Sequence, residues 1–192
     1  MRPIVIIIVV IILVFAGRHY LYEPFHSPTA SMSPAINKDD LFFAELFSYA
    51  QHPPARGDII VFHNARKMAF VKRVMGLPNE TIQLNAGVVY INGQAVTQTP
   101  LVKENDIVRY SEILPEGKAI VIWKKHEQIP ADNTGVFTVP PGHYFVLGDN
   151  RDESNDSRFS DTGFISEGNI VGKAVLLVWS GNTHNMDIRS LE

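Results

Sequence analysis

Beyond residue 20, apolar positions along the chain come in short runs or alternate with polar ones, which is the pattern of β-strands. Sustained helical periodicity is missing from this part of the sequence. Strands are predicted at residues 21–25, 40–47, 58–62, 68–75, 81–84, 88–91, 119–123, 136–139, 144–147 and 170–180. The pattern indicates a mostly-β fold made of antiparallel sheets.

Turn residues separate these runs. Asn92-Gly93 predicts a tight hairpin after residues 88–91, because both central positions of such a turn need a positive φ. Pro140-Pro141-Gly142 predicts a turn that joins residues 136–139 to residues 144–147 as a second β pair.

The pattern weakens in the middle of the chain. Residues 97–133 have mixed polarity and offer a single strand candidate, which indicates an inserted excursion. We therefore expect four parts: an N-terminal anchor (1–21), a main β core (22–80 and 140–182), a smaller inserted β subdomain (81–139) and a C-terminal tail (183–192).

The first residues carry the longest apolar run. Residues 4–16 are apolar without interruption, but a membrane-spanning helix needs about 20 residues. The run extends through residues 20–22 if the Arg18 side chain reaches the membrane interface. A cleavable secretory signal ending at Val14-Phe15-Ala16 is the alternative. The segment alone leaves both interpretations open: one transmembrane helix, or a removed signal.

Composition narrows the choice of function. The chain has 192 residues, is 45% hydrophobic and carries a net charge of −3, which suits one globular domain with a short anchor. No basic patch is dense enough to indicate nucleic-acid binding. Cysteine is absent, which excludes disulfides and a thiol nucleophile.

A serine lies between two prolines just before the second predicted strand. Residues 27–34 read Ser-Pro-Thr-Ala-Ser-Met-Ser-Pro, and Pro28 and Pro34 keep the backbone around Ser31 stiff and non-helical. A serine hydroxyl becomes a useful nucleophile only when a neighbouring base takes its proton. Taken alone, the stretch also fits a plain connector between anchor and domain.

Two cations stand next to each other in the predicted strand 68–75. Neighbouring side chains of a strand point to opposite faces, so either Lys72 or Arg73 faces inward if the other faces water. A desolvated lysine has a lowered pKa and can act as a general base. The alternative is a lysine that reaches out from an edge strand.

Residues 148–158 pack four acids and two arginines into eleven positions. A calcium loop starting at Asp152 is excluded, because its sixth position is Ser157 instead of glycine and its twelfth is Gly163 instead of glutamate. The segment is either a solvated loop or a platform that ion pairs and hydrogen bonds make rigid.

The seven histidines offer no competing site. No Gly-x-Ser-x-Gly elbow surrounds a serine, and His126-Glu127 is not followed by the second histidine of a zinc-protease helix. We expect each histidine to be a surface residue or a satisfied core residue.

Four collinear motifs together resemble the type I signal peptidases, which are membrane-anchored Ser/Lys endopeptidases. They are Ser-Met-x-Pro (31–34), Arg-Gly-Asp-Ile-Ile-Val-Phe (56–62), Lys-Arg-Val-x-Gly-x-Pro (72–78) and the block 148–158. The likeness covers about residues 20–180 apart from the excursion.

This resemblance implies a role for each matching residue. It implies Ser31 as nucleophile and Lys72 as general base, with the Thr29 hydroxyl and the Ser31 backbone N–H as oxyanion hole. Ser154 matches the serine that orients the lysine. Structural ion pairs and pocket residues follow by position: Asp149 with Arg73, Asp156 with Arg158, and a substrate pocket of Phe25, Pro28, Met32, Ile36, Phe42, Phe70 and Val71.

The sequence departs from the family pattern in a few places. Ser27 stands where an apolar residue, usually isoleucine, lines the pocket, which predicts a wider or more polar pocket. Asn79-Glu80 and Asp39-Asp40 each replace a more usual Gly-Asp, and residues 159–165 run about two residues longer than is typical.

The resemblance implies an endopeptidase that removes signal peptides from exported preproteins, with small residues one and three positions before the scissile bond. It also implies a monomer without metal or cofactor, held in the lipid bilayer by a single pass with its catalytic core on the extracytoplasmic side. Two alternatives remain: a specialised Ser/Lys maturation peptidase of a secretion or conjugation system, and an inactive membrane-anchored peptide-binding β domain.

Overall fold

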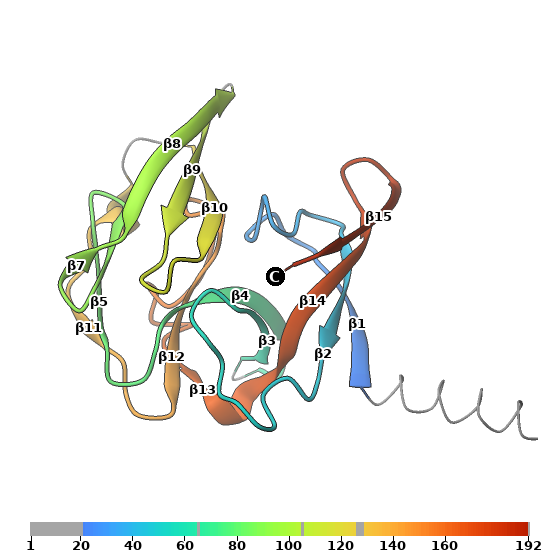
Figure 1. The fold of residues 1–192 in the computed structure, drawn as a ribbon, viewed down its shortest axis with the longest axis horizontal. Coiled ribbons are helices and arrows are strands. Elements are labelled where there is room, and N and C mark those ends of the chain that lie inside the picture. The colour runs from blue at the N-terminus through green and yellow to red at the C-terminus, as the bar shows by residue number, and fades with distance from the viewer. Residues whose placement is uncertain (1–20, 65, 105, 126–128, 192) are drawn as a thin grey trace, which may run out of the picture.

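The computed structural model describes residues 21–64, 66–104, 106–125 and 129–191, and these form a mostly-β fold of three antiparallel sheets (Figure 1). The main sheet is eight-stranded. It contains β1 (Tyr22–His26), β2 (Leu41–Glu45), β14 (Ile170–Ser180), β3 (Ile59–His63), β4 (Ala69–Gly76), β12 (His143–Leu147) and β13 (Ile165–Ser166) in this spatial order, with β15 (Asn185–Ser190) added to β14. The predicted antiparallel β fold is confirmed.

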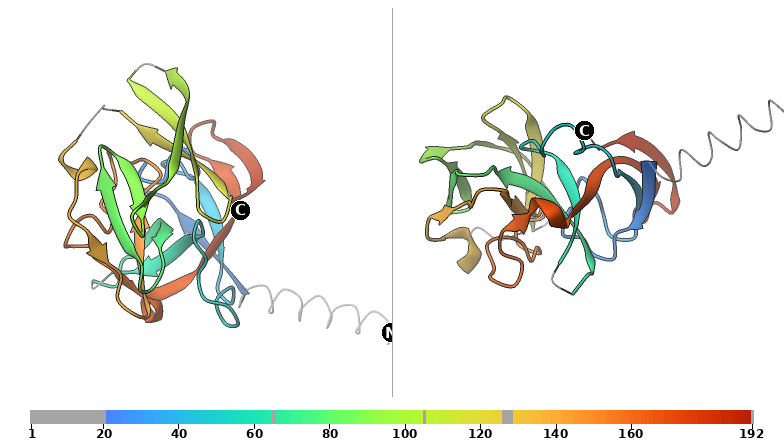
Figure 2. Two further views of the ribbon diagram at one scale, coloured as in Figure 1. Left: turned by 60° about the vertical axis from the view of Figure 1, so that its left-hand side comes forward. Right: turned by 90° about the horizontal axis from the view of Figure 1, so that it is seen from below.

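Two smaller sheets lie on the side of the molecule opposite β1, β2 and β15 (Figure 2). One has four strands, β11 (Phe137–Thr138), β5 (Thr81–Asn85), β6 (Val88–Ile91) and β7 (Gln94–Ala95) in order. The other has three, β10 (Ala119–Lys124), β9 (Ile107–Ile113) and β8 (Thr97–Glu104). Two short 3-10 helices, Pro130–Asp132 and Glu167–Asn169, complete the described elements.

The anchor prediction falls outside the described residues, because the apolar run 4–16 precedes residue 21. Within the described part of the chain, no helix has the length and apolar character needed to cross a membrane.

The sequence predictions agree best with the structure where the local pattern is strong. The long run at 170–180 is β14, which lies in the main sheet and pairs with β2 along one edge and with β3 along the other. The Asn92-Gly93 turn between β6 and β7 has the two positive φ values expected, 51° and 78°.

The predicted pairing of residues 136–139 with residues 144–147 is wrong. β11 pairs with β5, and β12 pairs with β4 and β13. Val139 exchanges backbone hydrogen bonds with Asn79 and Glu80, at 2.9 and 2.8 Å. The prolines at 140 and 141 have no N–H to give to a ladder, so the chain leaves one sheet there and enters another.

The strands β8 and β9 and the two-residue strand β13 were not predicted, and residues of the predicted tail form β15. Most of β8 is exposed, so no apolar alternation marks it in the sequence. β15 pairs with β14, and Leu191 after it is buried in the core.

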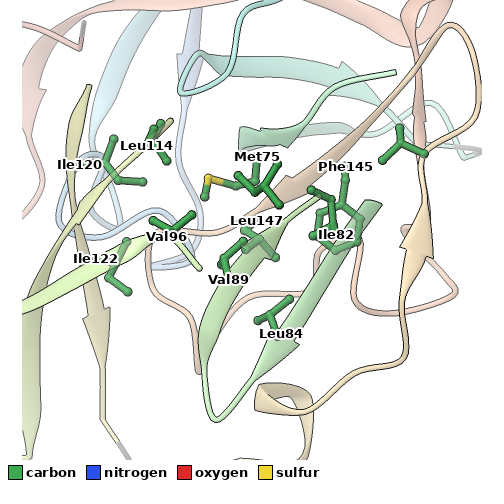
Figure 3. Packing of buried hydrophobic residues seen from close by; sticks show 12 residues of the cluster. Met75, Ile82, Leu84, Val89, Val96, Leu114, Ile120, Ile122, Phe145 and Leu147 are labelled. Atoms are coloured by element: carbon green, nitrogen blue, oxygen red, sulfur yellow. The ribbon is translucent and has the colours of Figure 1, made fainter. Parts of the chain in front are cut away.

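A single cluster of buried side chains joins the smaller sheets to the main one (Figure 3). Met75 of β4 and Phe145 and Leu147 of β12 pack against residues of β5, β6 and β10, among them Ile82 and Ile122. Because this cluster is continuous, the excursion is packed directly behind the strands that carry Lys72 and lead into the 148–158 block.

Candidate active site

Ser31 lies in the connection between β1 and β2 and is buried. The backbone around it is held at several points. Its carbonyl oxygen accepts a hydrogen bond from the Asn150 N–H at 3.1 Å, and the Asn150 side chain donates to the Ala30 carbonyl at 3.2 Å. Met32 and Ile36 form an isolated bridge and bury their side chains completely in the core. The Ser31 hydroxyl is therefore presented from a rigid backbone.

Lys72 in β4 points its side chain at Ser31. Its Nζ donates to Ser31 Oγ at 2.7 Å and to the Val71 carbonyl oxygen at 2.8 Å. The side chain is buried, and this burial lowers the pKa of Lys72 to about 8, although the negative charges of Asp156 and Asp149 act in the opposite direction. A substantial fraction of Lys72 is therefore neutral at mildly alkaline pH, as a base requires.

Arg73, the neighbour of Lys72, points to the other face of β4. It forms a bidentate pair with Asp149, with distances of 2.7 and 2.6 Å, and donates to the Gly57 carbonyl oxygen at 2.7 Å. The alternation of the strand thus separates the two cations, one toward the serine and one into an ion pair.

Thr29 lies beside the serine. Its hydroxyl donates to Ser31 Oγ at 3.2 Å and accepts from the Ser31 N–H at 3.5 Å. The structure thus brings together the two groups of the predicted oxyanion hole. Ser27, two residues earlier, is buried, and its hydroxyl donates to the Thr29 carbonyl oxygen at 2.9 Å.

Ser154 does not make the hydrogen bond expected from it. Its Oγ is buried without a hydrogen-bond partner among the residues described, whereas the Lys72 amine uses Ser31 and Val71. Ser154 nevertheless lies close to the site, because a Cβ added to Gly148 would come within 2.3 Å of Ser154 Oγ and 2.4 Å of the Ser31 carbonyl oxygen. Only glycine fits at position 148, between these two serines.

The 148–158 block is a platform held by buried ion pairs. Asp156 binds Arg158 through two hydrogen bonds, at 2.8 and 2.9 Å, and accepts the Gly148 N–H at 3.0 Å. Together with the Arg73–Asp149 pair, these contacts fix the loop to β4 and to itself. This is the rigid alternative of the two that the sequence left open.

A further buried pair was not foreseen. Arg151 is completely buried and binds Glu112 of β9 at 2.8 and 2.5 Å, and its Nε donates to the Gly148 carbonyl oxygen at 3.1 Å. The backbone of Trp123 in β10 adds two hydrogen bonds to the same loop, at 2.8 and 2.9 Å. The only hint of this pair in the sequence is that Arg151 is the one arginine of the 148–158 block for which no acidic partner was predicted.

A cleft of about 410 Å³ opens over the Ser31–Lys72 pair. Five of the predicted pocket residues line it: Phe25, Pro28, Phe42, Phe70 and Val71. The prediction is wrong for Met32 and Ile36, whose side chains turn into the core instead. Ser27 lines the cleft, and sequence reasoning missed the polar residues Glu153 and Asn155 at its rim.

The edge of β4 beside this cleft is open. β3 pairs with β4 from Ala69 to Arg73, whereas β12 pairs with β4 only from Arg73 onward. Over residues 69–72, no described strand occupies the second edge. Its backbone groups are therefore positioned to bind an extended peptide.

His26 lines the cleft, but it is exposed and its Nε2 lies 3.5 Å from Asp39. Ser31 Oγ is bonded to Lys72 and Thr29 instead. Among the described side chains, no group of three or more histidines and acids is arranged to hold a metal ion.

A serine that is hydrogen-bonded to a buried lysine on an antiparallel β scaffold belongs to the class of Ser/Lys nucleophilic sites. The chain belongs to the signal peptidase family, peptidase S26, whose sequence profile matches residues 1–179.

Relatives in this family cover most of the chain. It is 35% identical to signal peptidase I of Rickettsia typhi, over 89% of this chain and 77% of that protein. It is 34% identical to signal peptidase I of Pseudomonas fluorescens, over 88% and 69%. A crystal structure of a signal peptidase I from Enterococcus faecalis V583 shares 32% sequence identity, with a TM-score of 0.40, over 62% of this chain and 95% of that one.

Proposed function

We propose that this protein is a serine endopeptidase that removes N-terminal signal peptides from exported preproteins. Membership of the signal peptidase family supports the reaction. The observation that carries the mechanism is the 2.7 Å hydrogen bond between buried Lys72 Nζ and Ser31 Oγ at the base of an open cleft.

In the proposed mechanism, neutral Lys72 takes the Ser31 proton as Oγ attacks the carbonyl carbon of the scissile bond. The negative charge that develops on the carbonyl oxygen is stabilised by the Ser31 N–H and the Thr29 hydroxyl. The Lys72 ammonium then gives its proton to the departing amine, which leaves an acyl group on Ser31. Water then attacks this ester while Lys72 takes its proton, and the Lys72 ammonium gives a proton to Ser31 Oγ as it leaves, which restores the serine hydroxyl and neutral Lys72.

The open edge of β4 supports a mode of substrate binding. An extended peptide adds to residues 69–72 as a further strand, which places its carbonyl group next to Ser31. The aromatic and aliphatic walls of the cleft, including Phe25, Phe42 and Val71, then contact the small side chains before the scissile bond. Ser27 and its hydroxyl make this wall more polar than an isoleucine would.

The proposal includes a single-pass membrane protein with its catalytic core on the extracytoplasmic side, acting as a monomer next to lipid. The apolar run at residues 4–16, which the family profile includes in its match, supports this location. Alkaline carbonate washing of membranes tests it. Retention in the pellet with residues 4–16 present supports an anchor, and release with a new amino terminus at Gly17 contradicts it.

The test of activity is incubation of the purified full-length protein with a model preprotein, followed by mass spectrometry of both products. We expect one cut, after a residue that is small and preceded by a small residue two positions earlier. Ser31→Ala and Lys72→Ala protein serve as controls and should leave the preprotein intact. A wild-type protein that binds the signal peptide but never cuts it would establish the peptide-binding alternative.

A further inference from the structure

A second cavity adjoins the substrate cleft at the open edge of β4. It measures about 460 Å³ and lies between the tip of the β3–β4 hairpin and residues 159–165. Met68, Phe70 and Asn155 line both cavities, so the two spaces meet along this edge. Neither Ser31 nor Lys72 lines the second cavity, which is therefore displaced from the reacting serine.

The second cavity lies on the Phe70 face of β4, whereas the cleft, which Phe70 also lines, extends across the strand edge to the Val71 face. Val71, in the wall of the cleft, packs with the core cluster around Met32 and Ile36. Phe70 packs with the cluster on the other face and stacks on Phe62, with ring centroids 6.0 Å apart. Phe62 also lines the second cavity, which places that cavity on the Phe70 face.

The second cavity combines an apolar floor with a rim of hydrogen-bonding groups. Phe62 and Ile165 are buried beneath it, whereas Asp161 and Asn155 on its rim are exposed. Thr162 stands next to Asp161, and the turn that carries both is closed by the Thr162 and Gly163 N–H groups, which donate to the Phe159 carbonyl oxygen at 3.2 and 2.9 Å. An ordered turn, in the stretch that is longer than is typical, therefore forms one wall.

Successive side chains of an extended strand point to opposite faces. If residues one and three before the scissile bond place small side chains in the cleft, residues two and four point to the Phe70 face. We propose that the second cavity is a subsite for these alternate residues and that it takes a long, uncharged polar side chain such as glutamine. The stem of such a side chain covers the apolar floor while its amide bonds to the rim. The subsite rests on the proposed function, because that function supplies the peptide.

The test measures peptide binding separately from cleavage. Fluorescently labelled peptides with alanine, glutamine or leucine at position two or four are titrated into full-length Ser31→Ala protein. We expect glutamine at one of these positions to lower Kd about tenfold relative to alanine, and leucine to give a smaller gain. Equal Kd values for the glutamine and alanine peptides would overturn the subsite.

A blocking variant locates the effect. Thr162→Trp should fill the cavity and remove the glutamine preference while the alanine peptide keeps its Kd. Thr183→Trp, an equivalent change on the distant β14–β15 turn, should leave both Kd values unchanged. Asp161→Ala, a milder change on the same rim, should reduce the preference if Thr162→Trp fails to fold. If Thr162→Trp or Asp161→Ala raised Kd equally for the glutamine and alanine peptides, the proposal would be contradicted.

Cleavage of the alanine peptide by the wild-type protein is measured in parallel. No cleavage, together with a retained glutamine preference, would refute the proposed activity and leave the subsite standing. Cleavage without any glutamine preference would refute the subsite alone.

Discussion

Replacing Glu112 by glutamine should destabilise the protein and its active site, although Glu112 belongs to β9 and not to the cleft. Glu112 and Arg151 have exposed fractions of 0% and 1%, so the substitution leaves a buried guanidinium without its counter-charge. Breaking a buried ion pair in this way lowers the free energy of unfolding by about 3–5 kcal/mol. For a chain of this size, that loss lowers Tm by roughly 6–20 °C.

The effect on catalysis follows from the contacts of the loop. Arg151 binds the Gly148 carbonyl oxygen, and the next residue back, Asn150, holds the Ser31 carbonyl oxygen. We therefore expect kcat on a peptide substrate to fall even at temperatures where Glu112→Gln is fully folded. Thermal unfolding followed by circular dichroism, together with kcat at 20 °C below each Tm, measures both effects.

Two matched variants make the result interpretable. Glu104→Gln breaks the exposed pair with Arg109 and should cost no more than about 1 kcal/mol. The double change Glu112→Leu with Arg151→Met replaces both charges by apolar groups and should regain much of the lost stability. Equal losses for Glu112→Gln and Glu104→Gln, or a double variant less stable than Glu112→Gln, would refute the reasoning.

Four further predictions concern Ser31, the proposed base Lys72 and the neighbouring Thr29. Ser31→Ala and Lys72→Ala should each abolish cleavage in a folded protein, and the double variant should be no worse than either, because the two act as one proton-transfer unit; residual activity well above the double variant in either one would contradict this. The value of kcat/KM should rise about tenfold per pH unit up to about pH 8 and then level off, since only neutral Lys72 accepts the proton; a limb that disappears when a histidine is replaced would overturn the lysine base. The pKa of Lys72 is lower in the folded than in the unfolded chain, so protonation of Lys72 opposes folding below about pH 8, and this penalty fades as pH rises toward about 10.4. Lys72→Met should therefore have the larger free energy of unfolding at pH 7, and its advantage over the wild-type protein should shrink between about pH 8 and about pH 10.4. Thr29→Ala should lower kcat about 10²–10³-fold with little change in KM, while Thr29→Ser retains most activity; similar losses in both would mean that Thr29 is structural.

The sequence predicted those features that depend on local pattern. β14 is marked by its own apolar run, and the turn at Asn92-Gly93 by its need for positive φ. The approach of Ser31 to Lys72 was expected from family motifs, and the 2.7 Å distance agrees with them. Each of the four motifs is weak evidence alone, but together they predicted this approach because they follow one another in the order found in the family.

Features that depend on tertiary contacts were not predicted. β11 binds β5 across some fifty residues of sequence, and no local signal prefers that partner over β12. Glu112 and Arg151 are 39 positions apart, so their pairing needed the fold itself. Met32 follows Ser31 directly, yet the backbone turns its side chain into the core, and sequence spacing carries no information on that direction.

If substrates bind as proposed, the open edge of β4 at residues 69–72 selects polypeptides by their folding state before any side chain is recognised. A segment can join this edge only if its own N–H and C=O groups are free along one side. In a folded protein nearly all such groups are already paired with one another. A chain that is still extended satisfies the condition, whereas the same residues within a finished sheet do not. With this binding mode, we expect mature, folded proteins that carry a cleavable sequence on their surface to be protected by their own secondary structure.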